Sequence, residues 1–398
     1  MSRRLEEAEE YAIDVIMGGR KGAQAAMLRT LLLGLSQLYK LGVQSRLYLF
    51  RKRYLRDHQL GCLVISIGNL TVGGTGKTPV VEKFARALQN GGRRVAILTR
   101  GYKSKPPPDT RTFWDRLRLK KWVREPRIVS DGRNVLLDSE YAGDEPYMLA
   151  KNLKDVLVIV DKDRVKSGIC AIEKFGADTL LLDDGLQYLH LKHRLDIVLV
   201  DCQAPFGNEY LLPRGTLREP PSNLRRASYI FLTKSDGQNA GLIERIRKYN
   251  RRAEIIECAH QPLHLENLHS GEIVPLAFLQ GKYVGALSGI ASPASFENGL
   301  RKLGATVELN KRFADHHRYS REELDAFLKR CIRRDVHAIV TTEKDAVRFP
   351  KMKALEVPIF FLRVEIQILS GHETWEHCVR RICEPHNITP AEIPLQTV

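Results

Sequence analysis

The sequence predicts an α/β protein built on a doubly wound, mainly parallel sheet, followed by a second, smaller α/β domain. Short apolar runs alternate with segments of helical periodicity, which is the pattern of parallel strands joined by helices. A glycine-rich turn joins the first run to a helix pattern, and a second series of strands follows later in the chain. The runs of the first series are Cys62–Ile67, Val95–Thr99, Val156–Val160, Thr179–Leu182, Ile197–Val200 and Tyr229–Leu232, and those of the second are Tyr283–Leu287, Ala338–Thr341 and Ile359–Leu362.

Residues 1–55 are expected to form a basic, amphipathic N-terminal arm. Between Val15 and Tyr54 there are many cations and not one acid. Apolar side chains recur there at helical spacing, at Met27, Leu31, Leu32, Leu35, Leu38 and Tyr39. The apolar stretch is too short to span a bilayer. Two interpretations stay open: a helix that lies on a membrane surface, and a helix that packs on the protein's own core.

The remaining chain divides by its periodicity. Residues 56–253 form the first domain, and 254–280 are expected to be a linker, because the stretch Arg251–Gly281 is weakly periodic. Residues 281–384 form the smaller domain, and 385–398 are a proline-containing tail. Within the first domain, residues 103–127 carry three consecutive prolines and a basic stretch, which predicts an inserted surface loop.

Lysine and arginine total 63 against 47 aspartate and glutamate, a formal net charge of +16. Such an excess of positive charge favours binding to nucleic acid, anionic lipid or a phosphorylated substrate, and the charge by itself does not distinguish among these partners. The seven cysteines form no CxxC pair, so neither a zinc site nor a disulfide framework is expected. Reduced, cytosolic thiols are the simplest interpretation.

The strongest motif is a phosphate-binding loop between the first strand and the first helix, whose nucleotide-binding residues are Gly73, Gly74, Thr75, Gly76, Lys77 and Thr78. In a P-loop, backbone N–H groups cradle the phosphates, the lysine neutralises their charge and the following hydroxyl holds magnesium. The standard pattern has a glycine where this chain has Thr71. The order of strand, glycine loop and helix nevertheless predicts nucleotide binding on a P-loop NTPase-type sheet, in preference to a turn that serves packing alone.

Two adjacent carboxylates, Asp183 and Asp184, follow the apolar strand that starts at Thr179. An acid at this edge of the sheet lies beside the magnesium ion in P-loop enzymes. The alternative is a helix cap or a turn. Two acids after a buried strand favour the metal role.

Phosphoryl transfer also needs a group that orients or deprotonates the acceptor. Candidates are Asp144-Glu145, ahead of a predicted helix, and Asp315-His316-His317 in the second domain. Each has an ordinary alternative as a helix cap or a surface histidine. The residues by themselves do not decide this point.

Two other P-loop classes compete. Thr233-Lys234-Ser235-Asp236 resembles the base-reading element of GTPases, but Leu186 occupies the glycine position of their switch motif. The ParA-like ATPases place a lysine directly before the glycine pair, where this chain has Val72. A P-loop GTPase or ATPase switch that acts on a protein partner therefore remains the alternative hypothesis. A nucleic-acid-dependent ATPase lacks support, because aromatic or arginine clusters do not mark a binding face outside the loop.

Taken together, the motifs resemble the tetraacyldisaccharide 4′-kinase family, P-loop enzymes that phosphorylate the lipid A precursor. The resemblance runs from about Ser66 to Val347. Its blocks are Ser66–Pro79, Thr99–Tyr102, Gly143–Pro146, Leu182–Gln187, Leu212–Pro220, Ser288–Ala291, Phe313–His317 and Thr341–Asp345. Thr71 is then a family trait. The chain departs from the family's common form in the extension before Gln24, the basic loop, the tail, and Tyr188 where a histidine is frequent.

The resemblance implies roles for particular residues. Asp144 and His316 would prepare the sugar hydroxyl, and Lys77 with Arg218 would stabilise charge on the transferring phosphoryl group. Magnesium would be held among four residues: Thr78, Asp183, Asp184 and Glu219. ATP and Mg²⁺ are the implied substrate and cofactor.

The implied acceptor is a glucosamine disaccharide bearing acyl chains and a phosphate, in the cytoplasmic leaflet of the bacterial inner membrane. The protein is then a peripheral lipid kinase on an anionic membrane surface, and nucleic acid is not an expected partner. The basic arm suits this location, because cations meet anionic headgroups while leucines insert shallowly.

Overall fold

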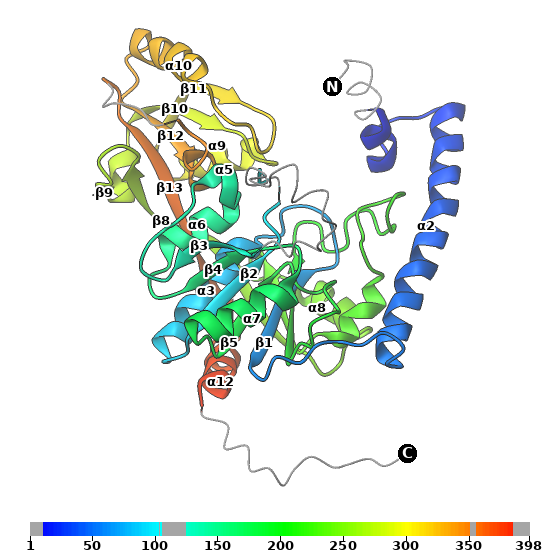
Figure 1. Ribbon diagram of the computed structural model, residues 1–398. Coiled ribbons are helices and arrows are strands. Elements are labelled where there is room, and N and C mark those ends of the chain that lie inside the picture. The colour runs from blue at the N-terminus through cyan, green and yellow to red at the C-terminus, as the bar shows by residue number, and fades with distance from the viewer. Residues whose placement is uncertain (1–10, 103, 106–124, 351–355, 385–398) are drawn as a thin grey trace, which may run out of the picture.

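The computed structural model describes residues 11–102, 104–105, 125–350 and 356–384. Within them, thirteen strands form one sheet in the order β11-β10-β12-β13-β8-β7-β6-β1-β5-β2-β4-β3, with β9 paired to β8 (Figure 1). The tail 385–398 and residues 106–124 of the inserted loop lie outside the described part. The strands are β1 (Leu63–Asn69), β2 (Val95–Thr99), β3 (Arg127–Asp131), β4 (Leu157–Val160), β5 (Thr179–Asp183), β6 (Leu195–Asp201), β7 (Tyr229–Thr233), β8 (Glu254–Asn267), β9 (Ile273–Val274), β10 (Tyr283–Ser288), β11 (Thr306–Arg312), β12 (Ala338–Thr342) and β13 (Ile359–Ser370).

The helix α2 (Ala23–Arg51) precedes the first strand. The helices that follow it flank the sheet, and they are α3 (Lys77–Asn90), α5 (Ser139–Ala142), α6 (Asp144–Asn152), α7 (Arg164–Phe175), α8 (Ala240–Arg247), α9 (Pro293–Lys302), α10 (Arg321–Arg333), α11 (Glu343–Ala346) and α12 (His372–Cys383), with short 3₁₀ turns at Pro221–Arg226 and Leu276–Leu279.

The first half of the sheet has the predicted doubly wound form. Strands β4, β2, β5, β1, β6 and β7 are mutually parallel, and β3 adds an antiparallel edge. One core cluster joins the sheet to α3, α6 and α12, and a second joins it to α7 on the other side. Because helices cover both faces, the central strands are almost continuously apolar and buried. The predicted α/β fold class is confirmed.

Two long strands, β8 and β13, connect the two halves. β8 starts parallel to β7 and then runs antiparallel to β13 as far as Asn267. The stretch 254–280, expected to be a linker, is therefore largely a strand. Its weak periodicity has a physical cause: the ladder shifts register beside Pro262, a residue that cannot donate a backbone hydrogen bond.

The second half of the sheet is smaller. β10 lies between β11 and β12, parallel to both, and β12 pairs parallel with β13. The helix α10 begins with a capping box in which Ser320 and Glu323 bond each other's backbone N–H groups. Figure 1 shows this half standing above the carboxyl edge of the first half.

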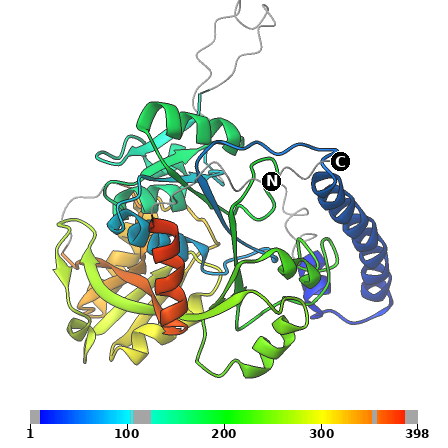
Figure 2. The ribbon, with the colours of Figure 1, turned by 90° about the horizontal axis from the view of Figure 1, so that it is seen from below.

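The arm contains the 29-residue helix α2, which runs along the outside of the molecule in both views (Figures 1 and 2). It attaches by polar contacts: the Ser36 hydroxyl donates to the Leu211 carbonyl at 2.8 Å, and the Tyr39 hydroxyl donates to the Arg218 carbonyl at 3.1 Å. Most of its leucines are exposed, with Leu31 at 60% and Leu38 at 67%. None of the described helices is both long and apolar enough to cross a membrane.

Candidate active site

The predicted P-loop joins β1 to α3, as the sequence pattern requires. Gly73 and Gly76 have φ values of 109° and 77°, which favour glycine. A Cβ atom at Gly76 would lie 2.8 Å from the Cε1 atom of His260, so a side chain does not fit there. The N-terminus of α3 begins at Lys77, where backbone N–H groups are available to an anion. The loop therefore has the form of a phosphate cradle.

The element that resembles a GTPase base reader instead braces this loop. The Thr233 hydroxyl donates to the Thr75 carbonyl at 2.9 Å, and Lys234 Nζ donates to the Gly74 carbonyl at 3.2 Å. The Asp236 carboxylate accepts a hydrogen bond from the Gln238 backbone, which is an ordinary turn. These contacts give the end of β7 a structural role in holding the cradle.

Lys77 points from the loop toward the end of β5. Its Nζ atom lies 3.1 Å from Asn69 Oδ1 and 3.5 Å from Asp184 Oδ1. Arg218 Nη1 donates to both oxygens of Asp184, at 2.9 and 2.7 Å. Burial by itself raises the pKa of Asp184, but the charges of Lys77 and Arg218 outweigh it and hold that pKa below the usual value. The predicted charge-stabilising residues thus meet on one carboxylate.

Asp183 is in a different environment from its neighbour. It is 5% exposed; Thr99 donates to Oδ2 at 3.2 Å, and Oδ1 has no hydrogen-bond partner within the described residues. Burial raises the pKa of Asp183 to about 6, and the nearby charges of Glu145 and Asp184 add to the effect. An unsatisfied buried carboxylate oxygen of this kind fits a cation that the site binds during its work.

The start of α3 and the end of β5 carry oxygen donors of the kind that magnesium prefers. The buried Thr78 hydroxyl, Asp183 and Asp184 supply hard ligands, and Mg²⁺ in kinases is held by one or two carboxylates together with substrate phosphates. Within the described residues, no three His, Cys, Asp or Glu side chains converge into a metal site, which agrees with a metal ion that takes part of its ligands from substrate phosphates. The residues present therefore fit a magnesium ion that binds together with a nucleotide.

Glu219, the fourth predicted ligand, is 3% exposed and fully engaged. Its Oε1 accepts from Gln187 at 3.0 Å, and its Oε2 accepts from Asn223 and Arg226, each at 2.7 Å. Gln187 also donates to the Asn69 carbonyl and accepts from Arg218. In this arrangement Glu219 supports the residues around Lys77, and its role as a metal ligand stays a prediction.

Asp144 and His316 come together from the two halves of the chain. His316 Nδ1 lies 3.0 Å from Asp144 Oδ2, and His316 has a φ of 65°, unusual for a residue with a side chain. Burial tends to raise the pKa of Asp144, but the His316 hydrogen bond and the Arg348 charge lower it overall. The carboxylate is therefore ionised and oriented toward the imidazole.

The sequence patterns did not single out some residues that complete the site. Asn69 orients Lys77, and Lys344 Nζ lies 2.5 Å from Glu145 Oε1. Burial raises the pKa of Glu145, but Lys344 and then Lys77 and His316 lower it overall. Asn69 and Lys344 both occur within family blocks, so the family match carried a signal for them.

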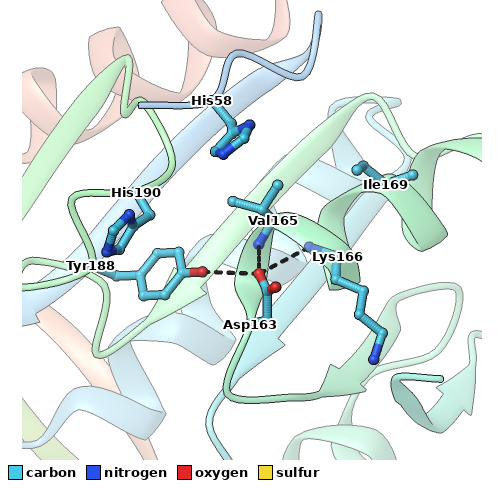
Figure 3. A pocket seen from close by; sticks show the side chains of 7 residues that line it. All are labelled: His58, Asp163, Val165, Lys166, Ile169, Tyr188 and His190. Carbon is cyan, nitrogen blue, oxygen red and sulfur yellow. Dashed lines mark hydrogen bonds between the residues drawn. The ribbon is translucent and has the colours of Figure 1, made fainter. Parts of the chain in front are cut away.

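A hollow of about 550 Å³ opens at the start of α7 (Figure 3). The predicted site residues do not line it. Tyr188 forms part of its wall and donates from its hydroxyl to Asp163 at 3.1 Å. The buried Arg164 guanidinium lies 5.0 Å from the centre of the Tyr188 ring. These contacts anchor the N-terminus of α7.

Comparison with known proteins identifies the family. Residues 28–384 match the Tetraacyldisaccharide-1-P 4′-kinase family. The chain belongs to this family. Curated tetraacyldisaccharide 4′-kinases from Syntrophus aciditrophicus and Anaeromyxobacter dehalogenans are 37% and 38% identical to it, over 86% and 90% of this chain and 90% and 91% of those proteins. The crystal structure of LpxK from Aquifex aeolicus in complex with ATP superposes with a TM-score of 0.70 at 30% identity, covering 89% of this chain and 99% of that one.

The family resemblance predicted from the motif blocks is therefore confirmed, and the protein is a lipid kinase of the lipid A pathway. The alternative of a GTPase or ATPase switch is not favoured. The relative from Aquifex aeolicus was solved with ATP, in keeping with the predicted nucleotide.

Proposed function

We propose that this chain transfers the γ-phosphate of ATP to the 4′-hydroxyl of a tetraacylated glucosamine disaccharide 1-phosphate, with Asp144 and His316 preparing the hydroxyl. The 3.0 Å contact between these two side chains carries the proposal, because it joins an imidazole to an ionised carboxylate beside the phosphate cradle. That combination orients and polarises a general base.

Binding of the triphosphate would use the cradle and its cations. Backbone N–H groups at the start of α3 and the Lys77 ammonium would hold the β- and γ-phosphates. Lys77 and Arg218 now neutralise Asp184, so incoming phosphate oxygens and a cation would redistribute these contacts. Magnesium, held by Thr78, Asp183 and Asp184, would supply charge neutralisation between the phosphates.

The acceptor step needs one proton to leave the sugar hydroxyl. With Nδ1–H of His316 donated to Asp144, the opposite ring nitrogen, Nε2, keeps its lone pair and accepts that proton as the new O–P bond forms. The ionised Asp144 then stabilises the imidazolium. The bond between the γ-phosphorus and the β–γ bridging oxygen breaks, and ADP leaves with that oxygen.

Access to an acylated substrate requires contact with a lipid surface, and α2 suits that contact. The side that carries Ser36 and Tyr39 is attached to the loop around Leu211 and Arg218, which leaves Met27, Leu31 and Leu38 exposed beside cations of the same helix. Amphipathic basic helices of this kind bind anionic bilayers. We place the protein peripherally at the cytoplasmic face of the bacterial inner membrane.

Radiolabelled transfer from [γ-³²P]ATP to the disaccharide acceptor in detergent tests the proposal. The expected result is a labelled lipid whose formation requires Mg²⁺, Lys77 and the acceptor. Equal turnover of GTP and ATP that is indifferent to the lipid would overturn it and favour the switch hypothesis. Loss of labelled product in His316→Ala, with ATP binding retained, would support the assigned roles.

A further inference from the structure

Two of the sequence blocks that the transfer mechanism leaves unused lead to one buried side chain, Arg348. Its side chain has no exposed area. One Nη1 atom donates to the Gly289 carbonyl at 3.0 Å and to Asp345 Oδ1 at 3.1 Å. Gly289 belongs to the block Ser288–Ala291, and Asp345 ends the block Thr341–Asp345. Both blocks therefore contribute a hydrogen-bond acceptor for the Arg348 guanidinium.

The surroundings of these two acceptors leave little free space. A Cβ atom at position 289 would lie 2.9 Å from the Tyr319 hydroxyl and 3.1 Å from Asp345 Oδ1, so the close approach needs glycine. Asp345 is fully buried and also accepts from Tyr319 at 2.9 Å and Thr342 at 2.7 Å. Because Tyr319 and Thr342 hold the Asp345 carboxylate in place, its hydrogen bond with Arg348 fixes the rotamer of the arginine.

The free edge of the guanidinium faces the Asp144 and His316 pair. Arg348 Nε donates to Asp144 Oδ2 at 2.8 Å, and Nη2 lies 3.2 Å from His316 Nδ1. The same carboxylate oxygen of Asp144 contacts both His316 and Arg348. Asp144 begins α6 in the first half of the chain, whereas the other two residues belong to the second half. One planar cation thus joins the members of the pair across the sheet's two halves.

The position of Asp144 decides which hydrogen bond the imidazole makes, because both Asp144 Oδ2, an acceptor, and Nη2 of Arg348, a donor, lie within reach of Nδ1. Without the carboxylate beside it, Nδ1 would accept from Nη2, which would place the ring proton on Nε2 and remove the base. With Nε of Arg348 holding Asp144 Oδ2, the carboxylate stays beside Nδ1 and accepts its proton. The φ of 65° at His316 adds a reason for such support, since that conformation persists only where its surroundings fix it.

We propose that Arg348 is the positioning residue of the transfer reaction: anchored on Gly289 and Asp345, it holds Asp144 in the orientation that keeps His316 competent as a base. Arg348 has no role in touching substrate, so it acts through the other two residues. The inference rests on the proposed roles of Asp144 and His316.

The test compares Arg348→Gln and Arg348→Lys with a second arginine of the same half, Arg363, whose side chain is 11% exposed. Arg363 also joins the two halves, through Glu343 of α11 and Glu82 of α3, but its ion pairs are not with Asp144 or His316. Arg348→Gln is expected to lower kcat about 100-fold, the loss expected of a misplacement near 1 Å, with the KM for ATP nearly unchanged. Arg348→Lys, which keeps the charge between two carboxylates, is expected to recover part of that loss. Arg363→Lys is expected to lower the melting temperature as much as Arg348→Lys while kcat falls less.

A double-mutant cycle separates positioning from general stability. If Arg348 acts through the pair, Arg348→Gln costs less than about threefold in the slow residual transfer of a His316→Ala background, because the two losses are not additive. Losses that multiply, or a kcat within about threefold of wild type for Arg348→Gln, overturn the inference. Near-normal transfer by His316→Ala overturns the proposed roles instead. Where Arg348→Gln melts below the assay temperature, Arg348→Lys is used in the same cycle and is judged by the same criterion.

Discussion

The Nδ1 atom of His316 lies 3.0 Å from the Oδ2 atom of Asp144, although 172 residues separate them in the sequence. The contact bridges the start of α6 and the loop that precedes α10. His316 is held at a φ of 65°, a conformation that costs roughly 1–3 kcal/mol and concentrates at functional sites. Strain of this kind agrees with the proposed catalytic role of the pair.

The first prediction concerns this pair. His316→Ala removes the base and Asp144→Asn allows the amide to donate to Nδ1, which favours the wrong tautomer. Each substitution is expected to lower kcat by about 10²–10⁴-fold, with ATP binding preserved. Steady-state transfer assays together with nucleotide-binding measurements check the result.

His317→Ala is the matched control for the pair. His317 Nε2 contacts Glu323 Oε2 at 2.9 Å, and its ring stacks on Phe313, so it shares the loop without facing Asp144. Its kcat is expected to stay within about threefold of wild type. Equal losses in His316→Ala and His317→Ala would mean that the loop, and not the imidazole of His316, determines the rate.

Lys77 is the subject of the second prediction. Its ammonium lies within reach of Asn69 and Asp184 at the mouth of the cradle, so Lys77→Ala removes a cation that neither glycine nor magnesium replaces. Transfer is expected to fall by about 10²–10³-fold, the range for losing one charge-stabilising donor. Lys83→Ala, on the same helix but over the Trp375 ring, is the control in the same assay. Turnover near wild type in Lys77→Ala would contradict the loop assignment.

Local patterns predicted the cradle well, because its features are close in sequence. Gly73, Gly76 and Lys77 are specified by one strand, one turn and one helix start, and the structure places them as that pattern requires. The acids at the end of β5 follow from the same logic. Short-range patterns of this kind are sufficient to predict the fold class and the binding of a nucleotide.

Contacts made by the tertiary fold were beyond those patterns. Arg348 looks like any arginine after a short helix, and only the approach of Asp144 and Gly289 reveals its place. Because Pro262 and the register shift interrupt the alternation of β8, the sequence predicts a linker at 254–280, whereas residues 254–267 form this strand. For Glu219, the family resemblance predicts a magnesium ligand, whereas in the fold its carboxylate accepts hydrogen bonds from Gln187, Asn223 and Arg226. Burial and pairing are decided by the whole chain.

The third prediction is a pH dependence that arises from His260. This histidine is packed against Gly76, and burial, with the Lys234 charge in addition, lowers its pKa below the ordinary value. The fold therefore favours neutral His260, and the stability linked to it is complete above the pKa of the unfolded chain, near 6.5, and is lost as pH falls through the folded pKa. The nucleotide-free protein is expected to lose stability through this group below about pH 6.5.

His260→Gln, which cannot acquire a charge, tests that origin. Melting temperatures of wild type and variant are measured from pH 8 to pH 5. As the pH falls, the melting temperature of the variant is expected to rise relative to that of wild type. Only wild type has a group at this position that gains a proton in the unfolded chain while the fold keeps it neutral. Parallel curves over the whole range would show that His260 does not contribute to the pH dependence.

The fourth prediction concerns α2. Leu31 and Leu38 are 60% and 67% exposed on a helix whose opposite side is attached through Ser36 and Tyr39. Fully burying one leucine side chain contributes roughly 1.5–3 kcal/mol, and shallow insertion of two leucines into the bilayer contributes part of twice that amount. Leu31→Gln combined with Leu38→Gln is therefore expected to weaken binding to anionic vesicles about tenfold or more, since 1.4 kcal/mol corresponds to one factor of ten.

Vesicle sedimentation at two salt concentrations measures the effect of the α2 variant. The matched control is Leu263→Gln combined with Leu369→Gln, two leucines that are 46% and 36% exposed on β8 and β13. The control should bind vesicles as wild type does, and the α2 variant should keep its transfer activity on substrate dispersed in detergent, because the cradle and the pair are untouched. Removing residues 1–40 should in addition make the remaining binding less sensitive to salt, since it deletes cations as well as leucines. If the two leucine variants lose vesicle binding equally, or neither loses it, then α2 is a support for the loop at Leu211 and Arg218 and does not make the membrane contact.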